Sequence, residues 1–163
     1  MKHLEAHLVF SCVILPIMRL YLDTYSLHRP LDDKSQPRIA LEAEAILAIL
    51  TACDEGAHTL VSSDILQFEV ARNPHPQRKA FVSEIIARAT DVISVTESVR
   101  KRAKELEQSG MKALDALHLA SAEAGSVDCF CTCDDRFLKR AKARTDMRVS
   151  VLAPLELAQE ILL

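Results

Sequence analysis

The stretch Arg19-Leu20-Tyr21-Leu22-Asp23 is a short apolar run that ends in an acid, a pattern typical of a buried strand. Comparable strands are predicted at residues 59–61, 91–95, 128–132 and 148–152, and a helical pattern separates each from the next. Strands that alternate with helices favour a parallel sheet covered on both faces. The sequence therefore predicts an α/β fold, a three-layer α/β/α sandwich with a central, mostly parallel sheet of about four to five strands.

Helical periodicity and end signals predict the elements between the strands. The predicted helices cover residues 38–54, 77–89, 113–124 and 134–143. A further helix is capped by Ser62 or Ser63 and ends near Arg72, a charged helix begins at Thr96 or Ser98, and a last helix begins at Pro154. Gly56, Gly110 and Gly125 each follow a predicted helix end, where glycine is favoured. Residues 24–37 are predicted to be a polar loop.

Composition narrows the class of protein. The chain has 163 residues, 49% of them apolar and 26% charged, which fits one globular domain and excludes a disordered tail. The net charge of −3 argues against a protein that binds nucleic acid by blanket positive charge. Five cysteines in no disulfide pattern indicate a reducing, cytoplasmic setting. Cys129, Cys131 and Cys133 alternate along a predicted strand, and we interpret them as small buried side chains rather than a zinc site.

The first residues need a separate interpretation. Residues 8–18 (LVFSCVILPIM) are mostly apolar, but a run of about eleven residues is too short to span a bilayer. No small-residue cleavage pattern follows it. We expect residues 1–17 to be a dispensable extension and residues 18–163 to form the domain. A short interfacial anchor or an export signal stays an alternative.

Acids at three places are predicted near the carboxyl ends of the strands, the edge where open parallel α/β sheets carry their chemistry. Asp23 ends the first strand, Glu69 lies on the helix after strand 59–61, and Asp134 follows strand 128–132. Asp115 lies near the start of an otherwise apolar helix, where an unpaired charge is costly. Clustered carboxylates repel one another, and a divalent cation relieves that repulsion.

Each acid also has a purely structural interpretation. Asp23 could form a turn, Glu69 could be solvated surface, and Asp115 could interact with the helix dipole in the first turn. The segment Thr132-Cys133-Asp134-Asp135 fits a capping box, so Asp134 and Asp135 could simply stabilise a helix start. His118, three residues after Asp115, is interpreted as a hydrogen-bonded helix histidine.

Taken together, these motifs resemble a PIN-domain ribonuclease, a family whose small members include VapC-type toxins and proteins that act in RNA processing. The resemblance runs from about residue 19 to residue 162. Leu22-Asp23-Thr24 resembles the first acidic motif of the family, and the segment around Glu69 (LQFEVAR) resembles the second. The segment around Asp115 (LDALHLASA) resembles the third, and Asp134 in Thr132-Cys133-Asp134 resembles the last. The family often has asparagine two residues after the first aspartate, where this chain has Tyr25.

The resemblance implies hydrolysis of RNA phosphodiester bonds with Mg²⁺ or Mn²⁺, hard cations that suit carboxylate ligands. Asp23 and Asp115 would be the main metal ligands, and Glu69 and Asp134 would complete the catalytic pocket. The resemblance also implies an antitoxin protein as a possible partner, a homodimer, a cytoplasmic location and no membrane.

Other functions are weighed against the same residues. A phosphotransferase of the haloacid-dehalogenase kind would need an acid where Tyr25 stands, and a receiver domain would need an acid pair at Asp23. A non-catalytic PIN-like binding module that acts through a protein partner stays an alternative. Phosphate contacts could come from Arg72, Arg78, Lys79, Arg88, Lys139, Arg140, Lys142 and Arg144. The alternating charges of residues 100–107 are interpreted as a solvated helix face.

Overall fold

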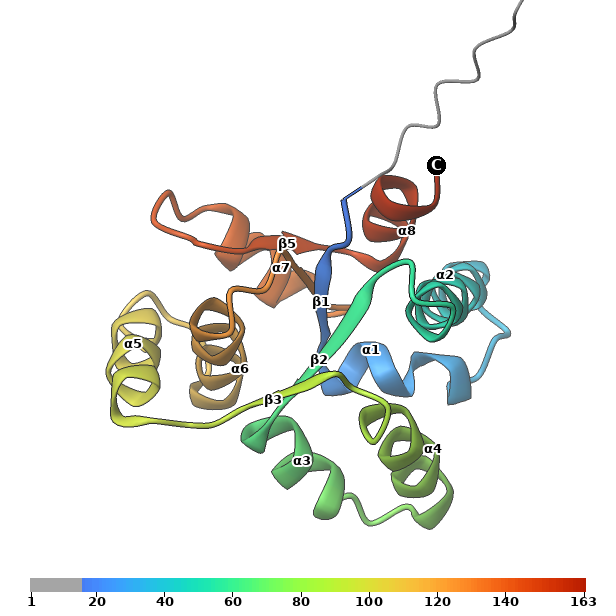
Figure 1. The fold of residues 1–163 in the computed structure, drawn as a ribbon, viewed down its shortest axis with the longest axis horizontal. Coiled ribbons are helices and arrows are strands. Elements are labelled where there is room, and N and C mark those ends of the chain that lie inside the picture. The colour runs from blue at the N-terminus through green and yellow to red at the C-terminus, as the bar shows by residue number, and fades with distance from the viewer. Residues whose placement is uncertain (1–15) are drawn as a thin grey trace, which may run out of the picture.

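The computed structural model describes residues 16–163, and its centre is a parallel five-stranded sheet (Figure 1). The strands are β1 (Arg19–Leu22), β2 (Thr59–Ser63), β3 (Asp91–Ile93), β4 (Cys129–Cys131) and β5 (Ser150–Leu152). Their order is β3-β2-β1-β4-β5, and every neighbouring pair is parallel. The predicted α/β fold is confirmed, with all strands parallel rather than most.

The strand order places a switch point beside β1. From β1 the chain crosses to β2 and then β3 on one side, and it later returns to β4 and β5 on the other. In open parallel sheets a crevice for ligands forms where the order reverses, beyond the carboxyl ends of the strands. Here that point lies between β1 and β4, whose pairing joins Leu22 to Cys131 at the last residue of each strand.

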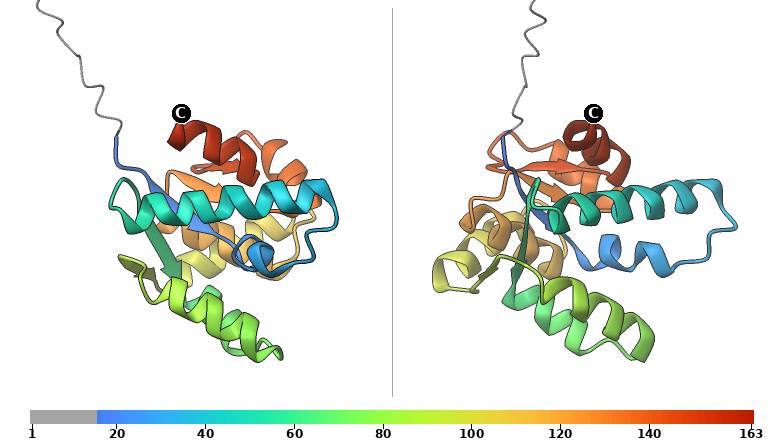
Figure 2. Two further views of the ribbon diagram at one scale, coloured as in Figure 1. Left: turned by 90° about the vertical axis from the view of Figure 1, so that its right-hand side faces the viewer. Right: turned by 45° about the vertical axis from the view of Figure 1, so that its right-hand side comes forward.

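Helices cover both faces of the sheet (Figures 1 and 2). Helices α5 and α6 lie on one side of the strands in Figure 1, and α2, α4 and α8 lie on the other. Packing within each layer is close, with α5 against α6 and α2 against α8. The helices are α1 (Thr24–His28), α2 (Pro37–Asp54), α3 (Asp64–Ala71), α4 (Pro76–Ile86), α5 (Glu97–Glu107), α6 (Ala113–Ala124), α7 (Asp135–Lys142) and α8 (Pro154–Leu162).

Half of the eight helices in the described residues begin at a side chain that accepts the first free backbone N–H groups. Ser63 caps α3 by accepting the N–H of Leu66, and Thr96 caps α5 by accepting that of Val99. Helices α2, α4 and α8 instead begin with proline, which has no N–H to leave unpaired. These local signals explain why the predicted helix boundaries agree closely with the structure.

The predicted polar loop over residues 24–37 is wrong in its first part. The chain forms α1 and a 3-10 turn, Arg29–Leu31, directly after β1. Asp23 starts α1 by accepting the backbone N–H of Ser26 at 2.8 Å, and Leu27 is buried in the core. The helix is a single short turn ended by Pro30, so it has too few residues to show a helical period in the sequence.

The core fills the space between the sheet and the helices with little room to spare. Tyr21, Phe130 and Leu119 are fully buried, and the rings of Tyr21 and Phe130 stack at 5.2 Å. Gly125 ends α6 where a Cβ atom would come within 2.2 Å of Ile93 Cδ1. The absence of a side chain at Gly125 therefore allows α6 to lie against β3.

The cysteines are structural within the described residues. Cys129, Cys131 and Cys133 are buried and free, as the interpretation of small buried side chains predicted. Burial raises the pKa of the Cys129 and Cys133 thiols to about 11, so both are protonated at neutral pH. Cys12 and most of the predicted extension lie outside the residues that the structure describes.

Candidate active site

Asp23 and Asp134 stand on either side of the switch point. Asp23 follows β1, and its backbone N–H donates to Cys131 O of β4 at 3.2 Å. Asp134 follows β4 and begins α7, where its Oδ1 accepts the N–H groups of Arg136 and Phe137 at 2.8 and 3.1 Å. Both side chains are therefore held by helix caps at the carboxyl ends of neighbouring central strands.

The interpretation that Asp134 stabilises a helix start is confirmed, whereas Thr132 does not cap that helix. The cap of α7 is Asp134, and Thr132 Oγ1 instead accepts the backbone N–H of Asp134 at 3.1 Å. Asp135 lies on the other side of the motif, where both of its oxygens bond to Arg38 at 2.6 and 2.7 Å. Asp135 is thus a surface ion-pair residue, while the Asp134 carboxylate caps α7.

Glu69 is linked to β1 and α6 by a line of buried polar groups. Tyr21 OH lies 2.7 Å from Ser63 Oγ and 2.6 Å from His118 Nδ1. His118 Nε2 in turn lies 2.5 Å from Glu69 Oε2, the same oxygen that accepts a short hydrogen bond from Thr24 Oγ1. This polar line joins β1, β2, α1, α3 and α6 and sets the position of the Glu69 carboxylate.

The direction of these hydrogen bonds follows from the charge of Glu69. Burial would raise the pKa of Glu69, but hydrogen bonds from His118 and Thr24 and the nearby imidazole outweigh it and lower the pKa. An ionised carboxylate only accepts, so His118 Nε2 carries the proton that it donates to Glu69. His118 is therefore the hydrogen-bonded helix histidine that the sequence indicated, and its partner is a candidate site residue.

Asp115 lies in the first turn of α6, one helical turn before His118. Burial raises its pKa, and the charges of Asp134 and Glu69 raise it further, while Lys112 and His118 lower it. The carboxylate that caps α7 and another on α3 therefore act electrostatically on Asp115. Within residues 16–163 no donor hydrogen-bonds to the Asp115 carboxylate.

Asp23 is the most deeply buried of the four acids. Its side chain is 6% exposed, and burial raises its pKa, although hydrogen bonds from Thr132 and Ser26 and the charge of His118 oppose that shift. The influence of His118 on both Asp23 and Asp115 links the two acids predicted as main ligands to the same imidazole. Charge effects thus connect four acids from four separate parts of the sequence, directly or through His118.

The four carboxylates are of the type that binds a hard divalent cation, although they do not form a closed metal site. Among residues 16–163, no three His, Cys, Asp or Glu side chains are gathered tightly enough to hold a metal ion as they stand. Asp115 has both oxygens unbonded in the described part of the chain, and Glu69 and Asp134 have one each. Carboxylate oxygens of this kind are the ligands that Mg²⁺ and Mn²⁺ prefer.

Sequence reasoning missed several residues that shape this region. Tyr21, Ser63 and Thr24 belong to the polar line that reaches Glu69. Of this part of the sequence, only Asp23, the residue before Thr24, was predicted to belong to the site. Lys112, next to the Asp115 motif, is the cation that most lowers the pKa of Asp115. A threonine directly after the first acid and a lysine three residues before the third were visible signals. Pairing each with its acid required the fold.

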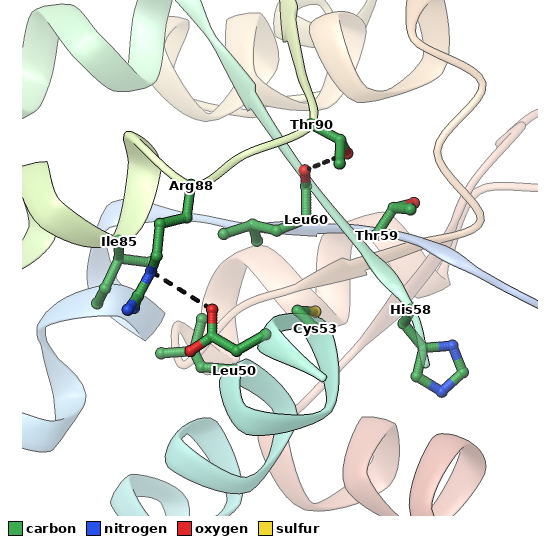
Figure 3. A pocket seen from close by; sticks show the side chains of 9 residues that line it. Leu50, Cys53, His58, Thr59, Leu60, Ile85, Arg88 and Thr90 are labelled. Atoms are coloured by element: carbon green, nitrogen blue, oxygen red, sulfur yellow. Dashed lines mark hydrogen bonds and ion pairs between the residues drawn. The ribbon is translucent and has the colours of Figure 1, made fainter. Parts of the chain in front are cut away.

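The cavity shown in Figure 3 belongs to the opposite edge of the sheet. It has a volume of about 30 Å³, about enough for a water molecule, and it lies beside the first residues of β2. Thr90 Oγ1 donates to Leu60 O there at 3.0 Å, and Arg88 pairs with Asp54 at 3.4 Å. The cavity is therefore no part of the region that the four acids border.

Comparison with known proteins fits this geometry. A protein-family model described as PIN domain matches residues 20–143, most of the chain. The chain belongs to the PIN domain family. Proteins of this family are typically ribonucleases that use divalent metal ions. No curated protein sequence matches the chain.

Two solved structures with TM-scores above 0.5 share the fold at low sequence identity. VapBC2 from Rickettsia felis, bound to a DNA fragment from their promoter, is 16% identical with a TM-score of 0.56. The match covers 83% of this chain and 98% of that one. PAE2754 from Pyrobaculum aerophilum is 11% identical with a TM-score of 0.53, over 90% of this chain and 98% of that one. FitAcB from Neisseria gonorrhoeae is 19% identical with a TM-score of 0.49, over 83% and 98%.

No helix among residues 16–163 is both long and apolar enough to cross a membrane. The cytoplasmic location inferred from the cysteines stays a prediction.

Proposed function

We propose that this PIN domain is a ribonuclease that hydrolyses RNA phosphodiester bonds with Mg²⁺ or Mn²⁺. Asp23 and Asp115 are the main metal ligands in this proposal, and Glu69 and Asp134 complete the pocket directly or through water. The observation that supports it best is Asp115, a carboxylate on an apolar helix whose pKa is raised by burial and by the charges of Asp134 and Glu69. Such repulsion favours binding of a cation.

The residues of the chain would prepare the site before any substrate binds. The cap of α1 fixes Asp23, the cap of α7 fixes Asp134, and His118 with Thr24 fixes Glu69, so three of the four carboxylates are held before RNA arrives. Positions set in advance lower the cost of organising the transition state. A bound divalent ion would supply an activated water and neutralise phosphate charge.

Basic residues would bring RNA to this acidic region, and half of the eight predicted ones already form ion pairs with acids. Arg78 pairs with Asp32, Arg88 with Asp54, Lys142 with Glu156 and Arg144 with Asp146. Arg72 and Lys139 have no acidic partner within residues 16–163, and neither has Lys112 beside Asp115. We therefore expect Arg72 and Lys112 to contribute more to RNA binding than the paired residues do.

The predicted solvated face on α5 is wrong for Arg102. Its guanidinium lies 2.7 and 3.1 Å from the two oxygens of buried Glu123 and 3.0 Å from Asp146, so this arginine joins α5, α6 and the segment before β5. These ion pairs occupy the Arg102 guanidinium, so we do not expect it to bind RNA.

The proposal is tested with the purified full chain and a fluorescein-labelled single-stranded RNA. We expect cleavage with Mg²⁺ or Mn²⁺, none with EDTA, and at least about a hundredfold slower cleavage by Asp115→Asn. Unchanged cleavage by that variant would remove the assigned mechanism. A wild type that cuts no RNA and still binds a protein partner would favour the non-catalytic binding module.

We also propose that the chain is the toxin of a toxin-antitoxin pair and forms a homodimer. The support is the shared fold with VapBC2, whose name denotes a pair of proteins. Expression of the chain alone should stop bacterial growth, and co-expression with the product of a small adjacent reading frame should restore it. Growth arrest by Asp115→Asn equal to that of the wild type would contradict this proposal. Light scattering would test the dimer.

A further inference from the structure

Helices α1 and α3 lie side by side and are joined at two levels. Thr24 Oγ1 donates to Glu69 Oε2, and Asn73 Nδ2, just past the end of α3, lies 3.2 Å from His28 Nε2. Both contacts join residues 45 positions apart in the sequence. A step of four residues toward the C-terminus of α1 is thus matched by a step of four residues toward the C-terminus of α3. The two helices therefore run parallel to each other.

This pairing decides which residues share a side. Each step along a helix turns the side chain by about 100°. In two parallel helices that face each other through Thr24 and Glu69, the residue after Thr24 and the residue before Glu69 project to one common side. Those residues are Tyr25 and Phe68. The other side carries Leu27, Leu66 and Val70, and these are buried in the core.

Tyr25 and Phe68 are exposed to solvent, by 58% and 51% respectively. The other aromatic residues in the described part of the chain are buried or partly buried. The two exposed rings are also next to the candidate site, because Tyr25 follows Asp23 by two residues and Phe68 directly precedes Glu69. Exposed aromatic side chains that gather at one place usually mark a binding surface.

A cation completes this surface. The guanidinium of Arg72, one turn after Phe68, lies 5.2 Å from the centre of the Phe68 ring. The same helical geometry places Arg72 on the side of Tyr25 and Phe68. No carboxylate within residues 16–163 pairs with Arg72, so its charge is available to a phosphate. We call Tyr25, Phe68 and Arg72 the aromatic shelf.

We propose that the aromatic shelf binds an unpaired base of the RNA on Tyr25 and Phe68 and an adjacent phosphate on Arg72. This inference rests on the proposed ribonuclease function and names how the site selects its substrate. Base stacking on aromatic rings is strong and available only where a base is not enclosed in a duplex. The shelf therefore favours RNA that is single-stranded at the position next to the cleaved bond.

The charge on the shelf favours RNA over a protein as its occupant. An apolar protein contact would not need the unpaired guanidinium that lies against Phe68, whereas a nucleotide offers both a flat base and a phosphate. The acids beside Tyr25 and Phe68 would bind the cation that acts on the same strand. A protein that covers the shelf instead is one of the outcomes of the test.

The test measures binding without cleavage. Asp115→Asn is used as the background, and fluorescence anisotropy gives the Kd for a labelled 12-nucleotide single strand in Mg²⁺. We expect Tyr25→Ala and Phe68→Ala each to weaken binding about 5- to 100-fold. Leu155→Ala removes a comparably exposed apolar side chain from α8 and should leave the Kd unchanged. Phe68→Tyr keeps an aromatic face and should retain most of the affinity.

A scan with abasic nucleotides separates stacking from a general structural effect. In the Asp115→Asn background, removal of the base at one or two RNA positions should weaken binding. Removal of the same bases should weaken the binding of RNA to Phe68→Ala much less. A blunt RNA duplex of the same sequence should bind equally to the background protein and to both alanine variants. Arg72→Gln should lower the salt dependence of binding by about one unit of slope.

Equal Kd values for single-stranded RNA in the alanine variants and the background protein would overturn the proposal that the aromatic shelf binds an RNA base. Loss of cleavage in Asp115→Asn would then leave the proposed function standing. Alanine variants that lose the dimer or a partner protein while binding RNA normally would assign the shelf to a protein contact and overturn the inference. A wild type that neither binds nor cuts RNA would overturn both proposals.

Discussion

His118 Nε2 lies 2.5 Å from Glu69 Oε2, and His118 Nδ1 lies 2.6 Å from the hydroxyl of Tyr21. The imidazole is 3% exposed and so acts on Glu69 from inside the protein. It is a positioning residue in the proposed enzyme, because it holds one oxygen of Glu69 and leaves the other unbonded.

We expect His118→Ala to slow RNA cleavage about 10- to 100-fold, the usual cost of losing a partner that orients a metal ligand. The concentration of Mn²⁺ that gives half-maximal cleavage should rise, a change that a purely structural role would not cause. His118→Gln keeps an N–H in reach of Glu69 and should recover part of the loss. Equal half-maximal Mn²⁺ concentrations in wild type and His118→Ala would contradict the role.

Two adjacent acids provide a matched pair of variants. Asp134 caps α7 and raises the pKa of Asp115, whereas Asp135 is 66% exposed and paired with Arg38. Asp134→Asn should slow cleavage at least about 100-fold, while Asp135→Asn should stay within about twofold of the wild type. Asparagine can still accept the capping N–H groups, so thermal unfolding should change little. A large loss of cleavage in Asp135→Asn would place the wrong acid in the pocket.

The sequence was informative where a local rule decides the structure. The helix starts near Ser63 and Thr96 and the helix end before Gly110 were predicted because capping depends on one or two neighbouring residues. Asp23, Glu69 and Asp134 were predicted because carboxyl ends of parallel strands meet at one edge. Asp115 was predicted because an unpaired charge on an apolar helix is costly and because its motif resembles that of PIN-domain ribonucleases.

Other features depend on contacts between distant residues and so could not be predicted. The contact between Tyr21 and His118 spans 97 positions, and nothing in either local segment identifies the other residue. The same holds for Arg102, whose charged helix looked solvated until Glu123 and Asp146 were placed beside it. Helix α1 was missed because one short turn has no detectable period.

Gly125 tests how tightly α6 is packed against β3. A Cβ atom at this position would meet Ile93 Cδ1 at 2.2 Å and Cγ1 at 2.7 Å, and the backbone of Gly125 adopts a φ of −83° that any residue tolerates. Gly125→Ala should therefore destabilise the fold by about 1–3 kcal/mol through overpacking alone. Urea denaturation would measure the change.

The second variant isolates the clash. Ile93→Ala removes both atoms that a Cβ at Gly125 would meet, so the double variant should cost less than the sum of the two single changes. Strictly additive effects would show that the contact between α6 and β3 is looser than the structure indicates.

Asp135 gives a pH dependence that can be measured on stability. The hydrogen bonds and charge of Arg38 lower the pKa of Asp135 below its ordinary value of 3.8. Because the folded pKa is the lower one, the unfolded chain binds the proton more readily, and stability rises with pH in this range. The contribution is complete above about 3.8 and is lost as the pH falls through the folded value.

Asp135→Asn should thus be less stable than the wild type at pH 6 and equal to it near pH 2. The difference should stay under about 1 kcal/mol because the ion pair is exposed. Asp33→Asn changes an acid without a cationic partner in residues 16–163 and is the control. A gap between wild type and Asp135→Asn that is the same at both pH values would argue against the ion pair.

Removal of residues 1–17 tests the proposed domain boundary. Ile17 is 65% exposed, whereas Met18 packs against the core, and its carbonyl accepts the N–H of Thr59 at 2.9 Å. A chain that begins at Met18 keeps this first contact of β1 with β2 and all four candidate acids. It should therefore unfold at nearly the same urea concentration as the full chain and cleave RNA at the same rate. A shorter chain that begins at Tyr21 loses that contact and should be strongly destabilised, because β1 is the central strand. Aggregation of the chain that begins at Met18 would show that the preceding residues belong to the folded domain.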